Sequence, residues 1–304
     1  MPNTENYKCP NHKCNGKIEI KYFGNDLNQK KINFNCTTDT YAKPSIYECK
    51  KCKIIFSELI FTMDENEIEK NYKDIADEKY ISQIKFKKYY FEKLCKRIDG
   101  LVNKTMDVLE IGSYYGVLGS VLKDKVKNYS GLELSTHGSN YAKKNFNLNI
   151  YNESIENHLK RNIKYDLIIM ADVIEHFKDP FKILSQVNRL LKKNGKLILT
   201  TFNIDSLYAK FTGKNYHWII PFHMVYFSNK TLEIFGRNNN LKLIKILNDP
   251  RYTSFGYLIE KLNFIFPKLS FIFKFLSKFS SLKDINVKVD LKDLKIYYFE
   301  KISN

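Results

Sequence analysis

The chain has 304 residues, 43% hydrophobic and 27% charged, a balance typical of a globular protein with room for one large domain and one small one. The sequence holds no run of about eighteen apolar residues, which argues against a membrane span, and its first residues lack the features of a signal peptide. A cytoplasmic location is therefore expected. The net charge of +17 would suit nucleic acid, but the lysines are spread along the whole chain, so a nucleic-acid partner is not favoured.

The N-terminal residues carry a cysteine pattern that is typical of a structural zinc site. Cys9 and Cys14 are separated by four residues, and Cys49 and Cys52 by two. Two such pairs on either side of a strand-rich stretch predict a zinc ribbon over residues 1–62, in which the four thiolates hold Zn²⁺ in a closed site.

Other assignments of the cysteines stay open at this point. His12 or Cys36 is an alternative for one ligand, and a set of free reduced thiols is the alternative for the whole cluster. Cys95 lies on the apolar side of an expected helix and is predicted to be a core residue.

Residues 63–100 are expected to form a linker and the first helices. A charged stretch comes first, and from about Lys79 apolar residues recur at helical spacing until Gly100.

Strand and helix signals then alternate from residue 101 to the end. Short apolar runs such as MDVLEIG, YDLIIMADV and KLILTTF predict strands. The stretch DPFKILSQVNRLLKKNG predicts a helix that Asp179 caps, that has Pro180 in its first turn and that ends at Gly195. Ser135 and Ser228 are expected to cap two further helices. This order predicts an α/β, doubly wound, mostly parallel sheet, whose ligands bind beyond the carboxyl ends of the strands.

The turn after the first of these strands indicates the ligand. In DVLEIGSYYG, Gly112 ends the strand, Gly116 begins a helix, and Glu110 stands at the strand tip. A carboxylate there would repel phosphate and attract a cation. Glu133 ends the next strand, where a carboxylate can accept both hydroxyls of a ribose. A ligand with a cationic amino group, a ribose and no phosphate is S-adenosylmethionine (SAM).

These stretches, with YDLIIMADVIEHFKDP and LLKKNGKLILTTFN, resemble class I SAM-dependent methyltransferases in order and spacing. They are most similar to the branch that includes ubiquinone-type and sugar methyltransferases. The resemblance covers roughly residues 100–250 and the last strand, and it implies a Rossmann-like, seven-stranded sheet. The chain departs from the family pattern at Tyr114, which replaces the middle glycine of the first turn.

The resemblance also implies roles for individual residues. Glu133 would hold the ribose, Glu153 would approach the adenine amino group, and the fourth strand would run along the cofactor. The implied cofactor-binding set is Glu110, Gly112, Gly116, Glu133, Glu153, Met170 and Ala171.

Two stretches are candidates for the acceptor side. Just past the fourth strand, Glu175 and His176 stand near Asp172, and they suit proton transfer or shape the loop. Some relatives of the ubiquinone-type branch use such a Glu-His pair with a divalent metal.

The second stretch, GKNYHWIIPFHMVYFS, holds the only tryptophan, Trp218, together with His223 and Tyr226. It resembles a segment of methyltransferases that carry an N-terminal zinc ribbon, and YECKKCKIIFSE resembles their second cysteine pair. The stretch suits an aromatic wall over a sugar or ring substrate, and core packing is its alternative. The predicted catalytic set is therefore Glu175, His176, His223 and Tyr226.

A helical insert is expected at about residues 252–285, broken at Pro267. It is apolar and rich in lysine, so residues 255–282 suit peripheral contact with a membrane surface, a cover over the acceptor site or a homodimer face.

The sequence thus predicts a SAM-dependent methyltransferase with a small-molecule acceptor. A sugar or sugar nucleotide is the first choice and a quinone-like ring is the second. An RNA or protein methyltransferase is one alternative, and a binding or scaffold protein that kept the fold without catalysis is another.

Overall fold

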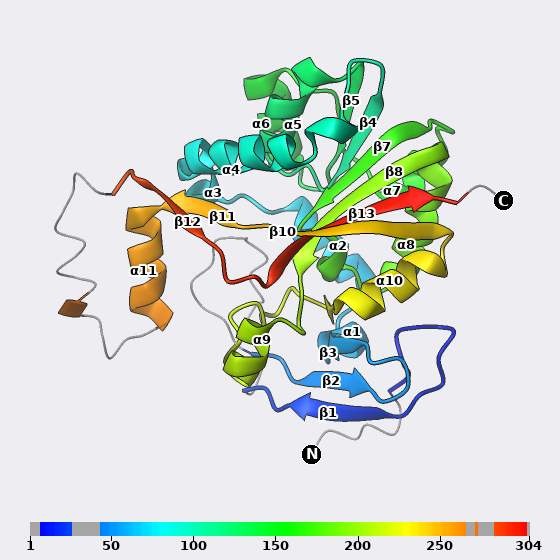
Figure 1. The fold of residues 1–304 in the computed structure, drawn as a ribbon, viewed down its shortest axis with the longest axis vertical. Helices are drawn as coiled ribbons and strands as arrows, with labels where there is room; N and C mark the ends of the chain where they lie inside the picture. The colour runs from blue at the N-terminus through cyan, green and yellow to red at the C-terminus, as the bar shows by residue number, and fades with distance from the viewer. Residues whose placement is uncertain (1–6, 26–42, 266–270, 273–282, 303–304) are drawn as a thin grey trace.

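The computed structural model of the protein describes residues 7–25, 43–265, 271–272 and 283–302. Its centre is a seven-stranded sheet in the order β10-β13-β8-β7-β4-β5-β6 (Figure 1). The strand β13 runs antiparallel to both of its neighbours, and the other paired strands are parallel, which confirms the predicted mostly parallel sheet. The strands are β4 (Asp107–Ile111), β5 (Asn128–Leu132), β6 (Ile150–Tyr151), β7 (Tyr165–Ala171), β8 (Leu191–Phe202), β10 (Leu241–Asn248) and β13 (Leu294–Lys301).

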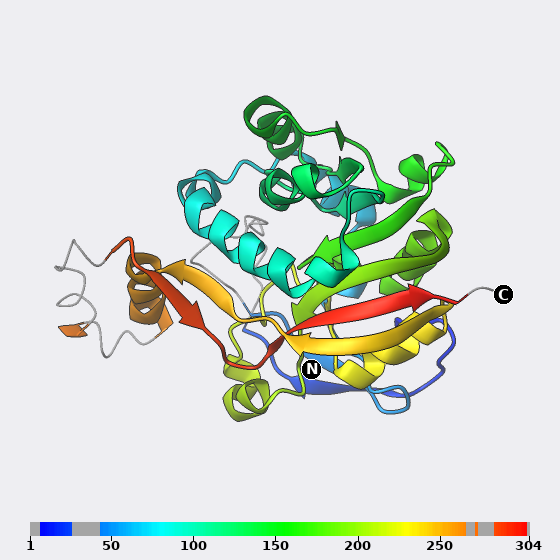
Figure 2. The ribbon, with the colours of Figure 1, turned by 45° about the horizontal axis from the view of Figure 1, so that its top comes forward.

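Helices cover both faces of this sheet, as Figure 2 shows. Side chains alternate along each strand, so Leu167 and Ile169 of β7 enter one core, and Ile168 and Met170 enter the other. One face carries α4 (Ile84–Arg97), α5 (Val117–Leu122) and α6 (Thr136–Phe146), and the other carries α7 (Ile155–Leu159), α8 (Pro180–Leu190) and α10 (Asn229–Arg237).

The predicted helix caps are confirmed, and one helix end is corrected. Ser135, Asp179 and Ser228 each accept a hydrogen bond from a backbone N–H in the first turn of α6, α8 and α10. The prediction that α8 continues to Gly195 was wrong. The helix ends at Leu190, because Leu191 already pairs with Tyr165 in the sheet.

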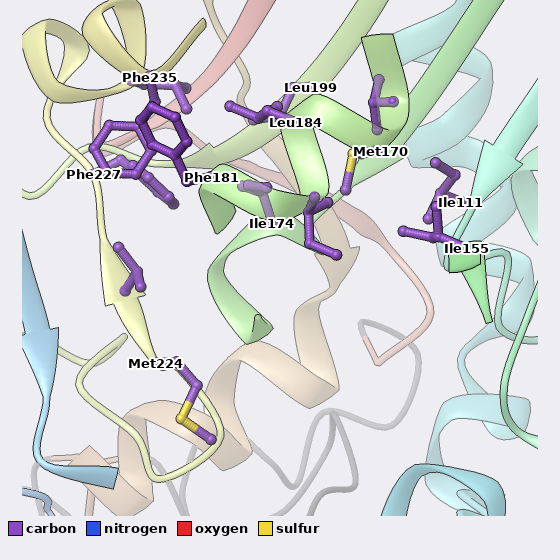
Figure 3. Packing of buried hydrophobic residues seen from close by; sticks show 14 of the residues in the cluster. Ile111, Ile155, Met170, Ile174, Phe181, Leu184, Leu199, Met224, Phe227 and Phe235 are labelled. Atoms are coloured by element: carbon purple, nitrogen blue, oxygen red, sulfur yellow. The ribbon is translucent and has the colours of Figure 1, made fainter. Parts of the chain in front are cut away.

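The N-terminal strands form a second sheet, in the order β1-β2-β3-β9. Its last strand comes from far along the chain, between β8 and α10. Figure 3 shows Phe227, directly after β9, beside Phe181 and Phe235 of the main domain. The elements are β1 (Ile18–Tyr22), β2 (Ile46–Cys49), β3 (Ile55–Ser57) and β9 (Val225–Tyr226), followed after β3 by α1 (Leu59–Thr62), α2 (Glu65–Lys73) and α3 (Glu78–Ser82).

The expected insert begins with a strand. β11 (Arg251–Ser254) pairs with β12 (Asn286–Val289), and α11 (Phe255–Ile265) follows β11 (Figure 1). The predicted break at Pro267 lies outside the described residues, as does most of the stretch expected to contact a membrane. In the part of the chain that the structure describes, every helix is too short or too polar to cross a bilayer.

Candidate functional site

A cavity of about 1580 Å³ opens at the carboxyl ends of the parallel strands. Residues of the predicted cofactor set and of the predicted catalytic set line the same cavity, among them Glu110, Gly112, Glu133, His176 and His223. A volume of this size can hold a cofactor and a small acceptor side by side.

Two glycines shape the turn after β4. Gly112 and Gly116 have φ values of 73° and 75°, a left-handed conformation that glycine adopts without strain. A Cβ on Gly116 would lie 2.6 Å from the Cβ of Ala142, so the close approach of α5 and α6 also requires glycine at this position. Both glycines of the predicted motif therefore have a physical reason to be glycine.

Tyr114, which stands where the family pattern has its middle glycine, takes a left-handed conformation with φ 46°. Its backbone N–H donates to Glu133 at 2.6 Å, which ties the turn to the end of β5. Its ring points toward α3, where it packs edge-on against Tyr80 at 4.7 Å between centroids, and its hydroxyl lies 3.4 Å from Asp77. The departure from the family pattern thus ties the segment before α4 to the cofactor turn.

We expect Tyr114→Gly to loosen this segment, although it restores the family glycine. The change relieves about 1 kcal/mol of backbone strain but removes a buried aromatic contact of similar or greater size. Amide hydrogen exchange over residues 75–82 should accelerate, and SAM affinity should not improve. Tyr114→Phe is the matched control, because it keeps the ring. A tighter SAM complex with unchanged exchange would contradict this account.

Two glutamates of the predicted cofactor set, Glu110 and Glu133, are buried and hydrogen-bonded. Glu133 accepts from the N–H groups of Tyr114 and Ser135, both at 2.6 Å, and burial raises its pKa to about 6. Glu110 accepts from the hydroxyl of Tyr129 at 2.5 Å, and burial raises its pKa to about 8. A cationic ligand beside these carboxyl groups would favour their charged forms.

The remaining residues of the predicted cofactor set lie in different surroundings. Glu153 lines the cavity, but its carboxylate is paired with Arg161 at 2.7 Å and with His158 at 2.8 Å. Ala171 lines the cavity, whereas the side chain of Met170 packs into the core (Figure 3). Their contacts with the cofactor stay predictions.

On the acceptor side, Glu175, His176 and His223 each offer a ligand atom, and these atoms lie within 4.8 Å of one another. Nδ1 of His223 is 2.8 Å from the carbonyl oxygen of Trp218, and Nδ1 of His176 is 3.1 Å from that of Phe222. A carbonyl accepts only from a protonated nitrogen, which leaves Nε2 of each ring as a lone-pair donor. The structure thus brings together two stretches that are almost fifty residues apart in the sequence.

Burial sets the charge of these three groups. It lowers the pKa of His176 to about 4 and the pKa of His223 well below its usual value, so both rings are neutral near pH 7. Burial and the nearby Asp172 raise the pKa of Glu175 to about 8. Oε2 of Glu175 is buried without a hydrogen-bond partner among the described residues. An orphaned carboxyl oxygen beside two neutral imidazoles fits a divalent cation, whose charge would favour the ionised form of Glu175.

The fourth predicted catalytic residue, Tyr226, lies behind His223. Its side chain is fully buried between β9 and the core, 6.5 Å from the His223 ring between centroids. Its part in catalysis stays a prediction.

Sequence reasoning missed two polar neighbours of this group. The hydroxyl of Tyr72, from α2, lies 3.1 Å from Nδ1 of His176. Arg251, from β11, donates to Asp172 at 2.6 Å and lies over the ring of Tyr90. Neither residue belongs to a recognisable motif, because only the folded chain brings these elements to the cavity.

The four predicted zinc ligands also meet. Sγ of Cys9 lies 3.4 Å from Sγ of Cys52, and Sγ of Cys14 lies 3.6 Å from Sγ of Cys49. His12 instead contacts Asp179 at 2.7 Å, and Cys36 lies outside the described residues. Cys95 is buried in the core, as predicted.

Comparison with known proteins agrees with this geometry. A family model described as a methyltransferase domain matches residues 86–246, more than half of the chain. The ubiquinone biosynthesis O-methyltransferase of Actinobacillus pleuropneumoniae is 25% identical over 118 residues, which are 36% of this chain and 50% of that protein. Its counterpart in Vibrio vulnificus is 24% identical over 153 residues, 46% of this chain and 64% of that protein. The chain spans about half to two thirds of the length of these relatives.

Solved structures share the fold. The YcgJ protein of Bacillus subtilis superposes with a TM-score of 0.50 at 15% identity, covering 71% of this chain and 99% of that one. The BH2331 protein of Bacillus halodurans gives a TM-score of 0.51 at 14% identity, covering 70% and 99%. The chain therefore belongs to the methyltransferase domain family, and its fold is the Rossmann-like α/β fold of class I SAM-dependent methyltransferases.

Proposed function

We propose that the protein transfers a methyl group from SAM to a hydroxyl oxygen of a small acceptor. The observation that carries this proposal is the group of Glu175, His176 and His223, which lines or adjoins the same cavity as the cofactor turn. Methyl transfer is an in-line displacement, so holding the acceptor oxygen against the cofactor is a large part of catalysis.

A hydroxyl acceptor must lose its proton. A histidine whose pKa is about 4 is a weak base at neutral pH, so His176 is better suited to hold a ligand than to take the proton. A divalent ion bound by the three side chains would lower the pKa of an acceptor hydroxyl beside it. The backbone carbonyls at Trp218 and Phe222 would fix both imidazoles in the required tautomer.

A hydroxylated ring is the acceptor class that the findings support best. The matched relatives are ubiquinone biosynthesis O-methyltransferases, and aromatic side chains stand beside the site. The ring of Phe222 stacks on that of His176 at 5.6 Å between centroids, and both line the cavity. A sugar or sugar nucleotide, the first choice from sequence, is kept as the second candidate because the same three groups can bind a vicinal diol.

The four cysteines are proposed to hold a structural Zn²⁺. In a tetrahedral site with Zn–S distances of about 2.3 Å, neighbouring sulfur atoms are separated by roughly 3.8 Å. The two measured separations, 3.4 and 3.6 Å, are close to this value. Such a site has no open position and would be structural.

Turnover on matched acceptors tests the proposed function. The wild-type protein should methylate a catechol-type ring in the presence of Mg²⁺ or Mn²⁺, and it should do so faster than a panel of sugar nucleotides. Glu175→Gln and His223→Ala should each lower turnover by at least about 100-fold, because one ligand or orienting group is lost. Their SAM affinity, measured by calorimetry, should stay within about threefold, since the cofactor turn lies on other strands.

Two results would contradict the proposal. If His223→Ala weakened SAM binding but left turnover unchanged, the assignment of His223 to the acceptor side would be wrong. If the wild-type protein bound SAM but methylated none of these acceptors, the scaffold alternative would take its place.

A further inference from the structure

We infer that the N-terminal four-stranded sheet positions the acceptor site, and that the cysteine cluster therefore controls acceptor geometry and not cofactor affinity. This inference rests on the proposed function, because it concerns the loop that carries His223. It assigns a role to the ribbon that the cysteine spacing alone does not indicate.

The strand β9 makes the connection. Ile55 and Phe56 of β3 pair with Tyr226 and Val225 of β9. The N–H of Ser57 donates to the carbonyl of Met224 at 2.9 Å, directly after His223 in the chain. The main chain directly after His223 is thus hydrogen-bonded to β3 of the N-terminal sheet.

Met224 extends this connection to the second acceptor stretch. Its own N–H donates to the carbonyl of Glu175 at 2.8 Å. One residue therefore links Ser57 of the ribbon with Glu175 of the main domain through its two backbone groups. Displacing β3 would disturb both sides of the Glu175, His176 and His223 group.

The cysteine cluster fixes the hairpin from which β3 emerges. Cys49 ends β2 and Cys52 lies in the turn that leads to β3, so both thiols belong to the β2–β3 connection. The turn is closed by hydrogen bonds from the Cys49 N–H to the Ile54 carbonyl at 3.0 Å and from the Lys53 N–H to the Cys49 carbonyl at 2.9 Å. Strands this short are marginally stable in isolation, so the sulfur cluster and the pairing with β9 are expected to support each other.

Side-chain packing runs through the same junction. Tyr47 and Phe56 of the ribbon share one buried cluster with Phe222, Met224 and Phe227, which flank His223 and β9. All five side chains are at most 3% exposed. An interface this well buried behaves as part of one core, so its strands cannot move independently.

One further contact joins the ribbon to the acceptor stretch. His12, which lies between Cys9 and Cys14, contacts the Asp179 cap of α8 at 2.7 Å. Among the cofactor residues, in contrast, Glu110 lies on β4 and Glu133 directly follows β5, and these two strands pair only within the main sheet. Loosening the ribbon should therefore displace the loop that carries His223 and leave the cofactor site in place.

The Ser57→Pro variant of the chain tests the inference. Proline removes both the N–H that donates to Met224 and the Oγ that accepts from the Leu59 N–H at 3.2 Å, whereas the matched control Ser57→Ala keeps the N–H and loses only the Oγ. Because Trp218 is the only tryptophan and its carbonyl holds His223, its fluorescence reports on the acceptor loop. Cys52→Ser is a second variant, which weakens the cysteine cluster without touching β9.

We expect Ser57→Pro and Cys52→Ser to speed amide exchange over residues 222–227 by about tenfold or more and to shift Trp218 emission to the red. SAM affinity by calorimetry should stay within about threefold, and Ser57→Ala should change exchange and emission much less than Ser57→Pro does. Unchanged exchange and emission in both variants would overturn the inference. Equal losses of SAM affinity and loop order would also overturn it, because the ribbon would then support the whole fold. The turnover of the wild-type protein tests the proposed function separately, so its failure can be distinguished from failure of this inference.

Discussion

Replacing Glu133 with alanine is expected to weaken SAM binding by at least about 100-fold. The carboxylate is predicted to accept the ribose hydroxyls, and it accepts the N–H group of Tyr114, in the cofactor turn, and that of Ser135, at the start of α6. Its removal takes away contacts with the ligand and also leaves two buried donors unpaired. Charge-assisted hydrogen bonds of this kind contribute about 1.5–3 kcal/mol each, which supports the expected factor.

Calorimetric titration with SAM and with its demethylated product measures this effect. Glu133→Gln is the matched control, since it keeps the shape and one acceptor oxygen, and it should lose less affinity than the alanine variant. Thermal unfolding of both variants shows whether the turn still folds. Wild-type affinity in a folded Glu133→Ala protein would mean that the ribose is held elsewhere.

The second large effect concerns the pH dependence of stability. Burial raises the pKa of Glu110 in the folded protein to about 8, from the ordinary value of 4.5. Below about pH 4.5 the carboxyl group is neutral in both states. Between these two values the unfolded chain ionises while the folded protein keeps its proton, so the free energy of unfolding falls as the pH rises. The loss attributable to one such group is about 1.4 kcal/mol per pH unit in that window.

Urea unfolding of the ligand-free protein between pH 5 and pH 8 measures this slope. Glu110→Gln removes one titrating group and should reduce the slope over the upper part of the range. Glu175, whose pKa is also raised to about 8, still contributes there, and Glu133, whose pKa is raised only to about 6, contributes at the lower end. Equal slopes in wild type and Glu110→Gln would show that Glu110 is ionised in the folded state.

Local sequence features were enough for the elements near the cofactor. The apolar run before Gly112, the capping residues Ser135 and Asp179, and the alternation of strands and helices all act through neighbours in the chain. The end of α8 was predicted wrongly because pairing of Leu191 with Tyr165, a tertiary contact, overrides the helical pattern.

The acceptor side shows the opposite situation. His176 and His223 were each named from their own stretch, but their approach to one another depends on the meeting of β7 with the loop before β9. Tyr72 and Arg251 reach the same cavity from α2 and β11, and no spacing rule connects them with Glu175. Tyr114 was a departure from a motif in the sequence, and only its contact with Tyr80 gave it a structural role.

The class of fold, the cofactor turn and the cysteine pairs could be predicted from periodicity and from residues a few positions apart. Three features emerge only in the folded chain: β9 completes the N-terminal sheet, Met224 links Ser57 to Glu175, and three ligand atoms meet within 4.8 Å. Strand pairing and burial create these features, because they join segments whose separation along the chain carries no local signal.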